Sequence, residues 1–550
     1  MPRNAPDPPS EWDIRSRRQP GRQPPAGTPA RTDSGKIVYL CGPQKKGVIS
    51  TIHIIGVLVT VGLLLGVSWW SGRKVKDARS FISGGSSGTW LVGGALLGTM
   101  AGGQSTIGTA QLAFCYGLSA WWFTLGAAIG SLLLGYVFAG PLRRSGCTTL
   151  LELVRREYGR KTETVGSLLC MLGIFISIVS QVLSSGAMIS GFFRLPMFWA
   201  SVAGAVLILL FVLFGGIRSA GFSGIVKLVL LYFSSLAAGV IVWRLAGGIS
   251  GLRAGVESLY QSPVLCEANG LTDAASIHQR YGNLLARGPL KDLGSCLSLT
   301  LGVVSTQTYA QCIWSAASTV KARRGALICA ICLPVIGAAC TMVGIYMRGH
   351  YVTADEMRAM QQAGEVLPAG IGVIESSAQA FPAFILRHLP AWLGGLMLGT
   401  LLINILGSGS GLLLGVATIL VRDVYSNLRR GTARISQLLE MRLSIAAVLL
   451  VAVGVALLCN NTFINDLGFL SLGLRAVSLL FPLSFALWLP GRFPARSILL
   501  AMPVGVAAML LAKFLQLPGD AVYYGLGIEL LAIVLGRKRQ KRGCAVSTAG

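Results

Sequence analysis

Polar residues that can bind a small solute or an ion interrupt an apolar segment near the start of the chain, residues 91–114. The middle of this segment contains glycines, hydroxyls and one amide: Gly98, Thr99, Gly102, Gly103, Gln104, Ser105 and Thr106. Glycine weakens a helix, and polar side chains gain nothing from facing lipid. Irregular backbone at membrane depth is tolerated only where it lines a cavity or is buried in protein. The pattern predicts a discontinuous helix at a binding site, with a tightly packed glycine-rich helix as the alternative.

A second apolar segment, residues 292–314, carries a similar run of polar side chains in its second half: Ser305, Thr306, Gln307, Thr308, Tyr309 and Gln311. So many amides and hydroxyls in one region favour a hydrated cavity. The alternative is that they form hydrogen bonds that join two helices. We expect this run to face the first one across a solute site. Gln181 and Ser184, in the apolar segment 163–190, are expected to line the same cavity.

A third segment, residues 391–421, suggests cation binding. Asn404, Ser408 and Ser410 lie among Gly407, Gly409 and Gly411. Hydroxyl and carbonyl oxygens are the ligands that hard cations prefer. The alternative is a glycine-lined packing face.

Arg475 is a charge inside the apolar segment 467–489. A cation at such a position costs a few kcal/mol on insertion scales, so it is a functional candidate. It either meets a carboxylate of the solute or fixes the end of a helix.

The elements that must position these residues are membrane helices. The 550 residues are 53% hydrophobic and 12% charged, against about 25% charged in soluble domains. We predict about 13 transmembrane helices of roughly 20 residues each. The net charge of +26 does not indicate nucleic acid, because the cations lie in loops between apolar segments. Phosphate-binding loops, nucleophile elbows and metal-ligand spacings are absent from the sequence, so we predict a protein that is not an enzyme.

The alternation of basic loops predicts the topology. Lys and Arg concentrate after the first segment, as at Arg73 and Lys74, after the third, as at Arg143 and Arg144, and in the tail 537–550. By the positive-inside rule these face the cytoplasm, which places the mature N-terminus outside and the C-terminus inside the plasma membrane. Two long loops, 247–291 and 348–390, then lie outside.

Residues 1–47 read as a disordered basic tail, rich in Pro, Arg and Gly. We hypothesise that this tail is not native and that translation starts near Val48, where the composition changes abruptly. The expected order is a first transmembrane helix (48–71), one repeat (88–246), the outer loop 247–291, a second repeat (292–489), two last spans (497–536) and the cytoplasmic tail 537–550.

Several stretches resemble the sodium/solute symporter family, which includes bacterial proline, pantothenate, sialic acid and galactose symporters. The stretches follow one another in order: RSFISGGSSGTW (79–90), TIGTAQLAFCYGL (106–118), FGGIRSAGFSGIVK (214–227), QTYAQCIWSAASTVKARRGA (307–326) and GSGSGLLLGVATILVRDVY (407–425). The resemblance implies an all-α polytopic membrane protein with a LeuT-type fold of two inverted five-helix repeats. The membrane topology of this family agrees with the orientation predicted from the positions of Lys and Arg in the loops.

The resemblance also implies the site residues. A Na+ site would take carbonyl oxygens of Gly98 and Ala101 and groups of Asn404, Gly407 and Ser408 on residues 391–421. Solute contacts would come from Gln104 and Ser105 at the first break and from Thr306, Gln307 and Gln311.

The sequence departs from the family at the ion site. Only Ser408 keeps a hydroxyl where relatives usually have two, and Gly224 stands where they commonly have Asp. Lys227 lies one turn further on. We hypothesise that its ammonium reaches into the weakened cation site and replaces sodium there, which would make transport proton-coupled or uncoupled. The alternative is that Lys227 extends to the inner membrane surface, because it lies only about one turn inside its segment.

We therefore expect a secondary active transporter that couples a small polar organic solute to a cation, most simply sodium, by alternating access. Two alternatives stay open: a proton-coupled or uncoupled transporter with a degraded sodium site, and a membrane sensor that works with a separate signalling partner. The expected partners are the solute, Na+ and the lipid bilayer. We expect no organic cofactor, nucleic acid or obligate protein partner.

Overall fold

The structure is a computed structural model that describes residues 30–31, 37–38, 50–74, 87–215, 222–368, 370–420, 437–459 and 462–547. The chain divides into two units, Met1–Lys46 and Gly47–Gly550. In the first unit, strand β1 (Ala30–Arg31) pairs antiparallel with β2 (Ile37–Val38). The rest of the predicted tail 1–47 lies outside the described residues.

The second unit is helical, and its first half holds two interrupted helices. In chain order the elements are α1 (Thr51–Lys74), α3 (Thr89–Met100), the π-helical turn η1 (Gln104–Gly108), α4 (Thr109–Tyr116), η2 (Gly117–Trp121), α5 (Trp122–Leu132), η3 (Leu133–Phe138), α6 (Ala139–Arg144), α7 (Leu150–Tyr158), α8 (Arg160–Phe193), α9 (Met197–Gly215) and α10 (Phe222–Ala246). The break that was predicted inside residues 91–114 is present. It lies at residues 101–103, between α3 and η1.

The second half repeats the plan of a broken helix followed by long helices. It contains α14 (Pro289–Val304), α15 (Gln307–Ser315), α16 (Thr319–His350), α19 (Ala391–Ile419), α21 (Gln437–Leu458), α22 (Ile464–Trp488), α23 (Ala495–Phe514) and α24 (Ala521–Ser547). Every segment predicted to span the membrane coincides with a helix or with the pieces of one. Within the described residues, eight helices are long and apolar enough to cross a membrane.

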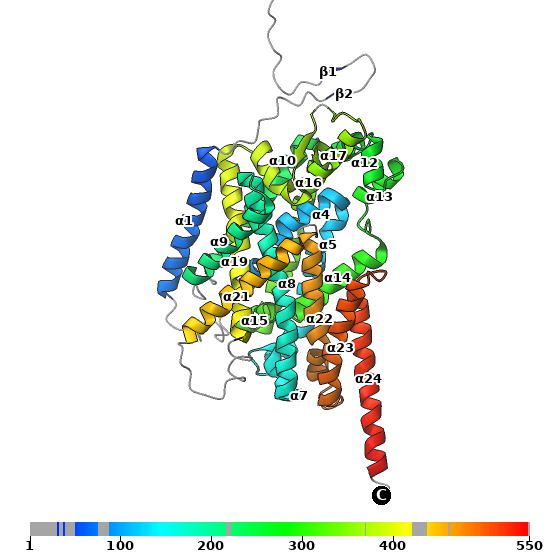
Figure 1. Ribbon diagram of the computed structural model, residues 1–550. Helices are drawn as coiled ribbons and strands as arrows, with labels where there is room; N and C mark the ends of the chain where they lie inside the picture. Colours follow the sequence, from blue (N-terminus) through cyan, green and yellow to red (C-terminus); the bar gives the residue numbers. More distant parts are fainter. Residues whose placement is uncertain are drawn as a thin grey trace, which may run out of the picture. The chain divides into compact units, whose positions relative to one another are not determined.

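Short elements fill the two long loops. The first contains α11 (Ile249–Leu259), α12 (Pro263–Ala268) and α13 (Ala274–Gly282). The second contains β3 (Tyr351–Thr353), α17 (Ala354–Gln362), β4 (Gly372–Ile374), η5 (Ser377–Gln379) and α18 (Ala380–His388), with β3 and β4 in parallel pairing. Helices α12, α13 and α17 lie together at the upper end of the helical unit, and α7 lies at its lower end (Figure 1).

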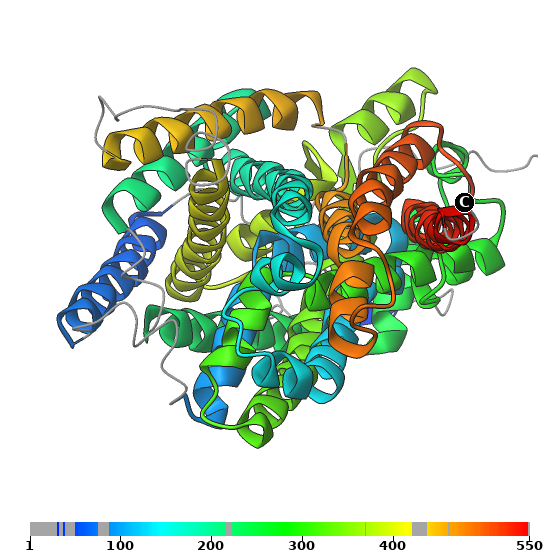
Figure 2. The ribbon, with the colours of Figure 1, turned by 90° about the horizontal axis from the view of Figure 1, so that it is seen from below.

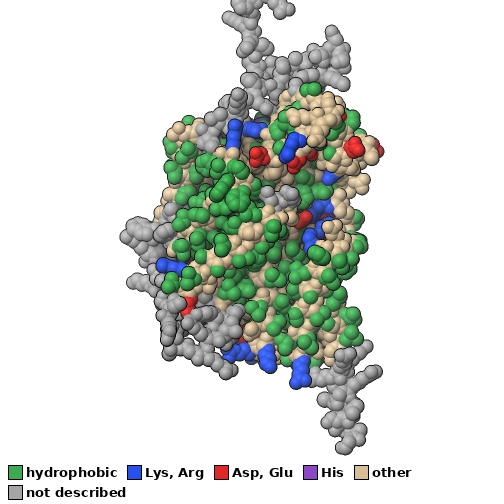
Figure 3. All heavy atoms as spheres, viewed as in Figure 1, with side chains coloured by type: hydrophobic (Ala, Val, Ile, Leu, Met, Phe, Trp, Pro, Cys, Tyr) green, Lys and Arg blue, Asp and Glu red, His purple; other side chains and the backbone are tan. Residues whose placement is uncertain are grey.

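The helices pack around α8 and α16. Helix α16 contacts α3, α4, α5 and α10, while α8 contacts α9, α19, α21 and α22. Helices α1 and α24 lie on opposite edges of this unit (Figures 1 and 2). On the face shown in Figure 3, hydrophobic side chains cover much of the surface, and Lys and Arg side chains lie both at the lower end, below this apolar surface, and towards the upper end. Apolar outward faces of this kind fit a lipid environment.

A buried arginine joins the two loops to the first broken helix. The Arg348 guanidinium is almost fully buried and donates two hydrogen bonds of 2.8 Å to the Glu356 carboxylate. It also donates to the Tyr260 hydroxyl at 2.7 and 3.0 Å. Its carbon Cζ lies 5.0 Å from the ring centre of Phe114 on α4. Because Tyr260 and Glu356 belong to different loops, this contact set fixes both loops over the end of α4.

Candidate functional site

The first break interrupts the helical segment formed by α3, η1 and α4, and it leaves backbone groups without their usual helical partners. Helix α3 ends at Met100, and Ala101 is extended, with φ −79° and ψ 106°. The Gly102 N–H donates to the Ser105 hydroxyl at 2.9 Å, and the Gly103 N–H donates to Gln181 Oε1 at 3.3 Å. These bonds replace part of the helical pairing that the break removes. The break therefore depends on an amide of α8.

Glycine is required at the break because neighbouring side chains approach closely. A Cβ on Gly103 would lie 2.6 Å from both Cβ and Oγ of Ser184 on α8. A Cβ on Gly102 would lie 3.1 Å from Gln181 Nε2 and 3.3 Å from Ser408 Oγ. The first break therefore packs closely against both α8 and α19, as expected if these segments share a site.

The structure brings two of the predicted solute residues onto α8. Gln104 Nε2 donates to the Ser180 hydroxyl, next to Gln181. Gln181 itself is 3% exposed and accepts from the break. The Ser105 hydroxyl also donates to the Gly102 carbonyl at 2.9 Å, so it is engaged with its own turn. Gln104 and Gln181, called the amide pair below, thus each make a hydrogen bond between the first break and α8.

Two groups predicted to bind the cation meet at Lys227. The Lys227 ammonium donates to Ser408 Oγ at 3.2 Å and to the Gly98 carbonyl at 3.4 Å. A Cβ on Gly407 would lie 3.5 Å from the same nitrogen. The Lys227 ammonium therefore lies on two of the oxygens that the resemblance implies for the cation. Gly224 lies in the part of α10 whose side-chain environment is not described.

Asn404 and Ala101 complete the predicted cation set and are both fully buried. Asn404 precedes Ser408 by one helical turn, so the two side chains share a face of α19. Among the described residues, neither Oδ1 nor Nδ2 of Asn404 has a hydrogen-bond partner. Buried amides are normally paired, so an amide without partners marks a position where a ligand can bind.

The second break lies between α14 and α15 at Ser305 and Thr306. The Thr306 hydroxyl donates to the Gly302 carbonyl at 2.6 Å and accepts from Arg475 Nη1 at 3.5 Å. Gln307 is oriented elsewhere: its Oε1 accepts from the Leu150 N–H at 2.7 Å, at the start of α7. Gln311 is half-buried on α15. Of the three residues predicted here, only Thr306 contacts the charged residue of α22.

Arg475 is 3% exposed and is surrounded by hydroxyls. Its Nη2 donates to Ser177 Oγ at 2.8 Å and to Ser471 Oγ at 3.0 Å. The sequence analysis missed both serines. The available signal was their spacing, because Ser471 precedes Arg475 by four residues and Ser177 precedes Gln181 by four.

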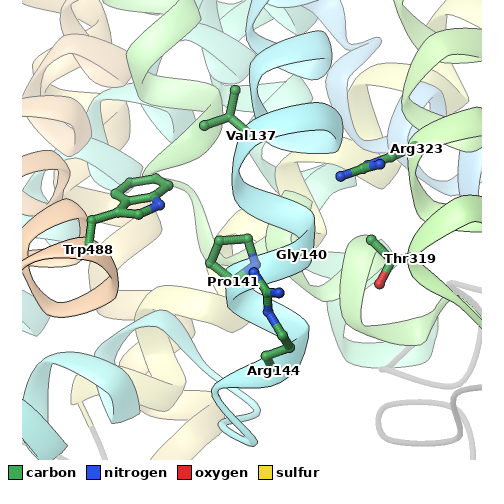
Figure 4. Close-up of a pocket in the computed structure, with 7 residues that line it drawn as sticks. All are labelled: Val137, Gly140, Pro141, Arg144, Thr319, Arg323 and Trp488. Atoms are coloured by element: carbon green, nitrogen blue, oxygen red, sulfur yellow. The ribbon is translucent and has the colours of Figure 1, made fainter.

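A separate cavity of about 350 Å³ opens near the lower end of the helical unit and contains none of the predicted site residues (Figure 4). Arg144 and Arg323 supply its charge, while Val137, Pro141 and Trp488 supply apolar surface. Its position at the basic end separates it from both breaks. In the described part of the chain, no three His, Cys, Asp or Glu residues are grouped so as to hold a metal ion.

Comparison with known proteins gives consistent results. Residues 80–497 match the sequence model of the Sodium:solute symporter family. The chain is 23% identical over 381 residues to the uncharacterized symporter YwcA of Bacillus subtilis (strain 168), covering 68% of this chain and 69% of that protein. The structure is similar to that of a Na+-coupled sialic acid symporter in a substrate-bound outward-open state. That match has a TM-score of 0.62 at 16% identity and covers 88% of this chain and 97% of the other.

The likeness of the structures confirms the predicted fold, an all-α membrane protein with the LeuT-type arrangement. The family match confirms the expected transporter class, a multi-pass membrane protein that carries out cation-coupled symport. The comparisons do not favour the uncoupled and proton-coupled transporters or the sensor that the sequence left open. Because the family model covers most of its length, this chain belongs to the sodium:solute symporter family.

Proposed function

We propose that this protein moves a small polar organic solute across the plasma membrane together with Na+, and that the mature N-terminus lies outside and the C-terminus inside. The ion binds between the first break and α19, at the Gly98 and Ala101 carbonyls, Asn404, Gly407 and Ser408. A single observation carries this assignment: an ammonium from α10 already lies on two of these oxygens, Gly98 O and Ser408 Oγ. Oxygens that accept one cation from two helices are suited to accept another.

Asn404 supports the same assignment. Its fully buried amide has no partner on either atom, and it lies on the face of α19 that carries Ser408. An amide oxygen is a hard ligand for a small cation. A Na+ ion that bound Asn404 Oδ1 would pair an atom that is otherwise buried without a partner, which is costly.

Sodium and the Lys227 ammonium exclude one another at this site. Two unit charges 4 Å apart repel by about 4 kcal/mol at an effective dielectric constant of 20. The described residues around Lys227 contribute no carboxylate that would offset this repulsion. Sodium binding therefore requires the ammonium to leave, and the position of Lys227 near one end of α10 allows its chain to extend to the membrane surface.

This exchange gives Lys227 a role in the transport cycle. With Na+ bound, Lys227 is displaced and the solute is carried inward. After Na+ leaves, the ammonium occupies the oxygens and stabilises the empty site, which lets the unloaded carrier return. Ligands that favour one conformation shift its population by their differential affinity, and a tethered ammonium acts on the same equilibrium.

The solute binds beside the two breaks. Gln104 and Gln181 present an amide pair at the first break, together with Ser105, and Thr306 lies at the second. Gln311 on α15 is assigned to the edge of this site. Gln307, whose amide bonds the start of α7, contributes only when that contact opens.

Uptake by the purified full chain in liposomes tests the proposal. Labelled amino acids, carboxylates, sugars and nucleosides are each offered with an inward sodium gradient, with an inward proton gradient, and with neither. We expect one solute class to accumulate above equilibrium only with the sodium gradient. Accumulation driven by protons without any effect of sodium would overturn the ion assignment.

A further inference from the structure

Arg475 is a buried cation without a counter-ion. Its guanidinium is 3% exposed, and its hydrogen bonds in the described structure go only to the hydroxyls of Ser177, Ser471 and Thr306. No described carboxylate pairs with it, and within the described part of the chain its Nε has no partner. Hydroxyls satisfy donors but do not neutralise charge, and an unpaired buried ion costs several kcal/mol. The resting structure therefore holds an unused positive charge and an unused donor.

The second break adds further donors at the same place. Thr306 is the N-cap residue that precedes α15, but its hydroxyl bonds the Gly302 carbonyl and does not cap the helix. The first N–H groups of a helix have no partner within it, and the positive end of the helix dipole favours an anion there. The Ser305 hydroxyl beside them is 1% exposed and also has no partner. Arg475 thus meets the start of α15 at Thr306, and the neighbouring Ser305 hydroxyl has no partner among the described residues.

This group of donors is linked to the amide pair at the first break. The Ser177 carbonyl accepts from the Ser180 hydroxyl at 2.8 Å, and Ser180 in turn accepts from Gln104. Arg475 is therefore about one turn of α8 away from the side chains assigned to the solute. A solute that contacts Gln104 with one polar group can reach Arg475 with another.

We infer that Arg475 binds a carboxylate of the transported solute, so that the substrates are small organic acids or amino acids. This inference rests on the proposed function and names the substrate class of the same site. A carboxylate accepts from a guanidinium in a two-bond geometry, with one bond from Nε and the second from Nη2 once Nη2 releases Ser177 or Ser471. Ser305 and the first N–H groups of α15 are positioned as further donors to it.

The test compares acids with their uncharged amides. Propionate, lactate and succinate are paired with propionamide, lactamide and succinamide, for wild type and for Arg475→Gln, Arg475→Lys and Ser478→Ala. Ser478 is a matched control because it is buried on the same helix and bonds only the Leu474 carbonyl. Binding is read from the shift of the thermal unfolding midpoint in detergent, and transport from sodium-driven uptake in liposomes.

For one acid we expect Arg475→Gln to raise the half-saturating concentration by about 30- to 1,000-fold, as for removal of one partner of a buried charge pair. Weak binding of its amide should change little, Arg475→Lys should recover part of the affinity, and Ser478→Ala should behave as wild type. A merely structural arginine would lower binding of acid and amide together, and that result would overturn the inference. So would an unchanged acid affinity.

Two further outcomes have defined meanings. If binding of an uncharged solute needs chloride in wild type but not in Arg475→Gln, when methanesulfonate replaces chloride, then the site holds chloride and the inference is overturned. If acids stabilise wild type but not Arg475→Gln, while sodium drives no uptake, then the inference stands and the proposed sodium coupling fails.

Discussion

The Lys227 ammonium lies 3.2 Å from the Ser408 hydroxyl oxygen and 3.4 Å from the Gly98 carbonyl oxygen, so a cation of the protein itself joins α10, α19 and α3. Helix α10 also packs directly against both α3 and α19. The residue is half-buried, and its ammonium lies on these two oxygens. Burying a charged group costs free energy unless polar groups pair with it, and the two oxygens supply that pairing.

Removing this ammonium should strengthen sodium binding. We expect Lys227→Gln to lower the sodium concentration that half-saturates uptake by about tenfold, equivalent to about 1.4 kcal/mol, because the repulsion between two cations is lost. The measurement is solute uptake in liposomes at varied sodium concentration. Lys321→Gln serves as the control, since Lys321 is exposed in the first turn of α16. An unchanged sodium dependence in Lys227→Gln would show that the ammonium and the ion do not compete.

The Ser408 hydroxyl should matter more to the ion than a hydroxyl two turns earlier on α19. Ser408→Ala removes an oxygen ligand, and we expect a sodium affinity weaker by about tenfold or more, as for a hydrogen bond to a charged group. Thr400→Ala is the matched control, because the buried Thr400 hydroxyl bonds the Leu396 carbonyl within α19. Sodium-dependent uptake distinguishes the two. Equal effects of both substitutions would place the ion elsewhere.

The positions of the helices could be predicted from the sequence because the length of an apolar run indicates the length of the membrane helix. An apolar run that ends at charged or Pro-rich residues fixes a helix such as α16 or α22 to within a few residues. The first break was predictable as well, since glycine, amide and hydroxyl residues cluster at membrane depth mainly where the backbone lines a cavity or is buried in protein. These signals are local, and they need no knowledge of neighbouring helices.

The directions of individual side chains could not be predicted in the same way. Gln307 and Gln311 lie four residues apart on α15, yet Gln307 bonds the start of α7, because packing brings the Leu150 N–H within 2.7 Å of its oxygen. Arg475 left two roles open in the sequence, since its partners Ser177 and Thr306 come from distant helices. Contacts across nearly 300 residues are set by helix packing, and a single sequence does not encode them visibly.

Glycine should be essential at the first break and replaceable at the start of α3. Gly103→Ala would place a Cβ 2.6 Å from the Ser184 side chain, so either the break or α8 must shift. We expect uptake to be lost, with destabilisation of about 1–3 kcal/mol from overpacking. Gly88→Ala is the control, because a Cβ at the start of α3 meets nothing within 4 Å and its φ is −71°. Normal transport by Gly103→Ala would mean that the break tolerates movement away from α8.

The contact between Arg348 and Glu356 predicts an acid-sensitive element in the two long loops. Burial raises the pKa of the Glu356 carboxyl. The opposite effect is larger: the Arg348 charge and hydrogen bonds from Arg348, the Thr353 N–H and Asn269 lower the pKa to about 2. The unfolded value is near 4.5. A carboxyl whose pKa is lower in the folded state adds stability that is complete above the unfolded pKa. That stability is lost as the pH falls towards the folded pKa.

Glu356→Gln should therefore destabilise the protein at neutral pH, by about 3–5 kcal/mol, because it leaves the Arg348 guanidinium buried without its charge partner. Asp355→Asn is the matched control: Asp355 pairs with Arg358, but the two side chains are 85% and 70% exposed, and such a pair contributes about 0–1 kcal/mol. Thermal unfolding in detergent measures both. The difference between wild type and Glu356→Gln should shrink between about pH 4.5 and about pH 2, since protonation of Glu356 makes the two proteins alike. A difference that stayed constant over this range would show that the ion pair does not depend on the Glu356 charge, and that Arg348 is held by Tyr260 and Phe114 alone.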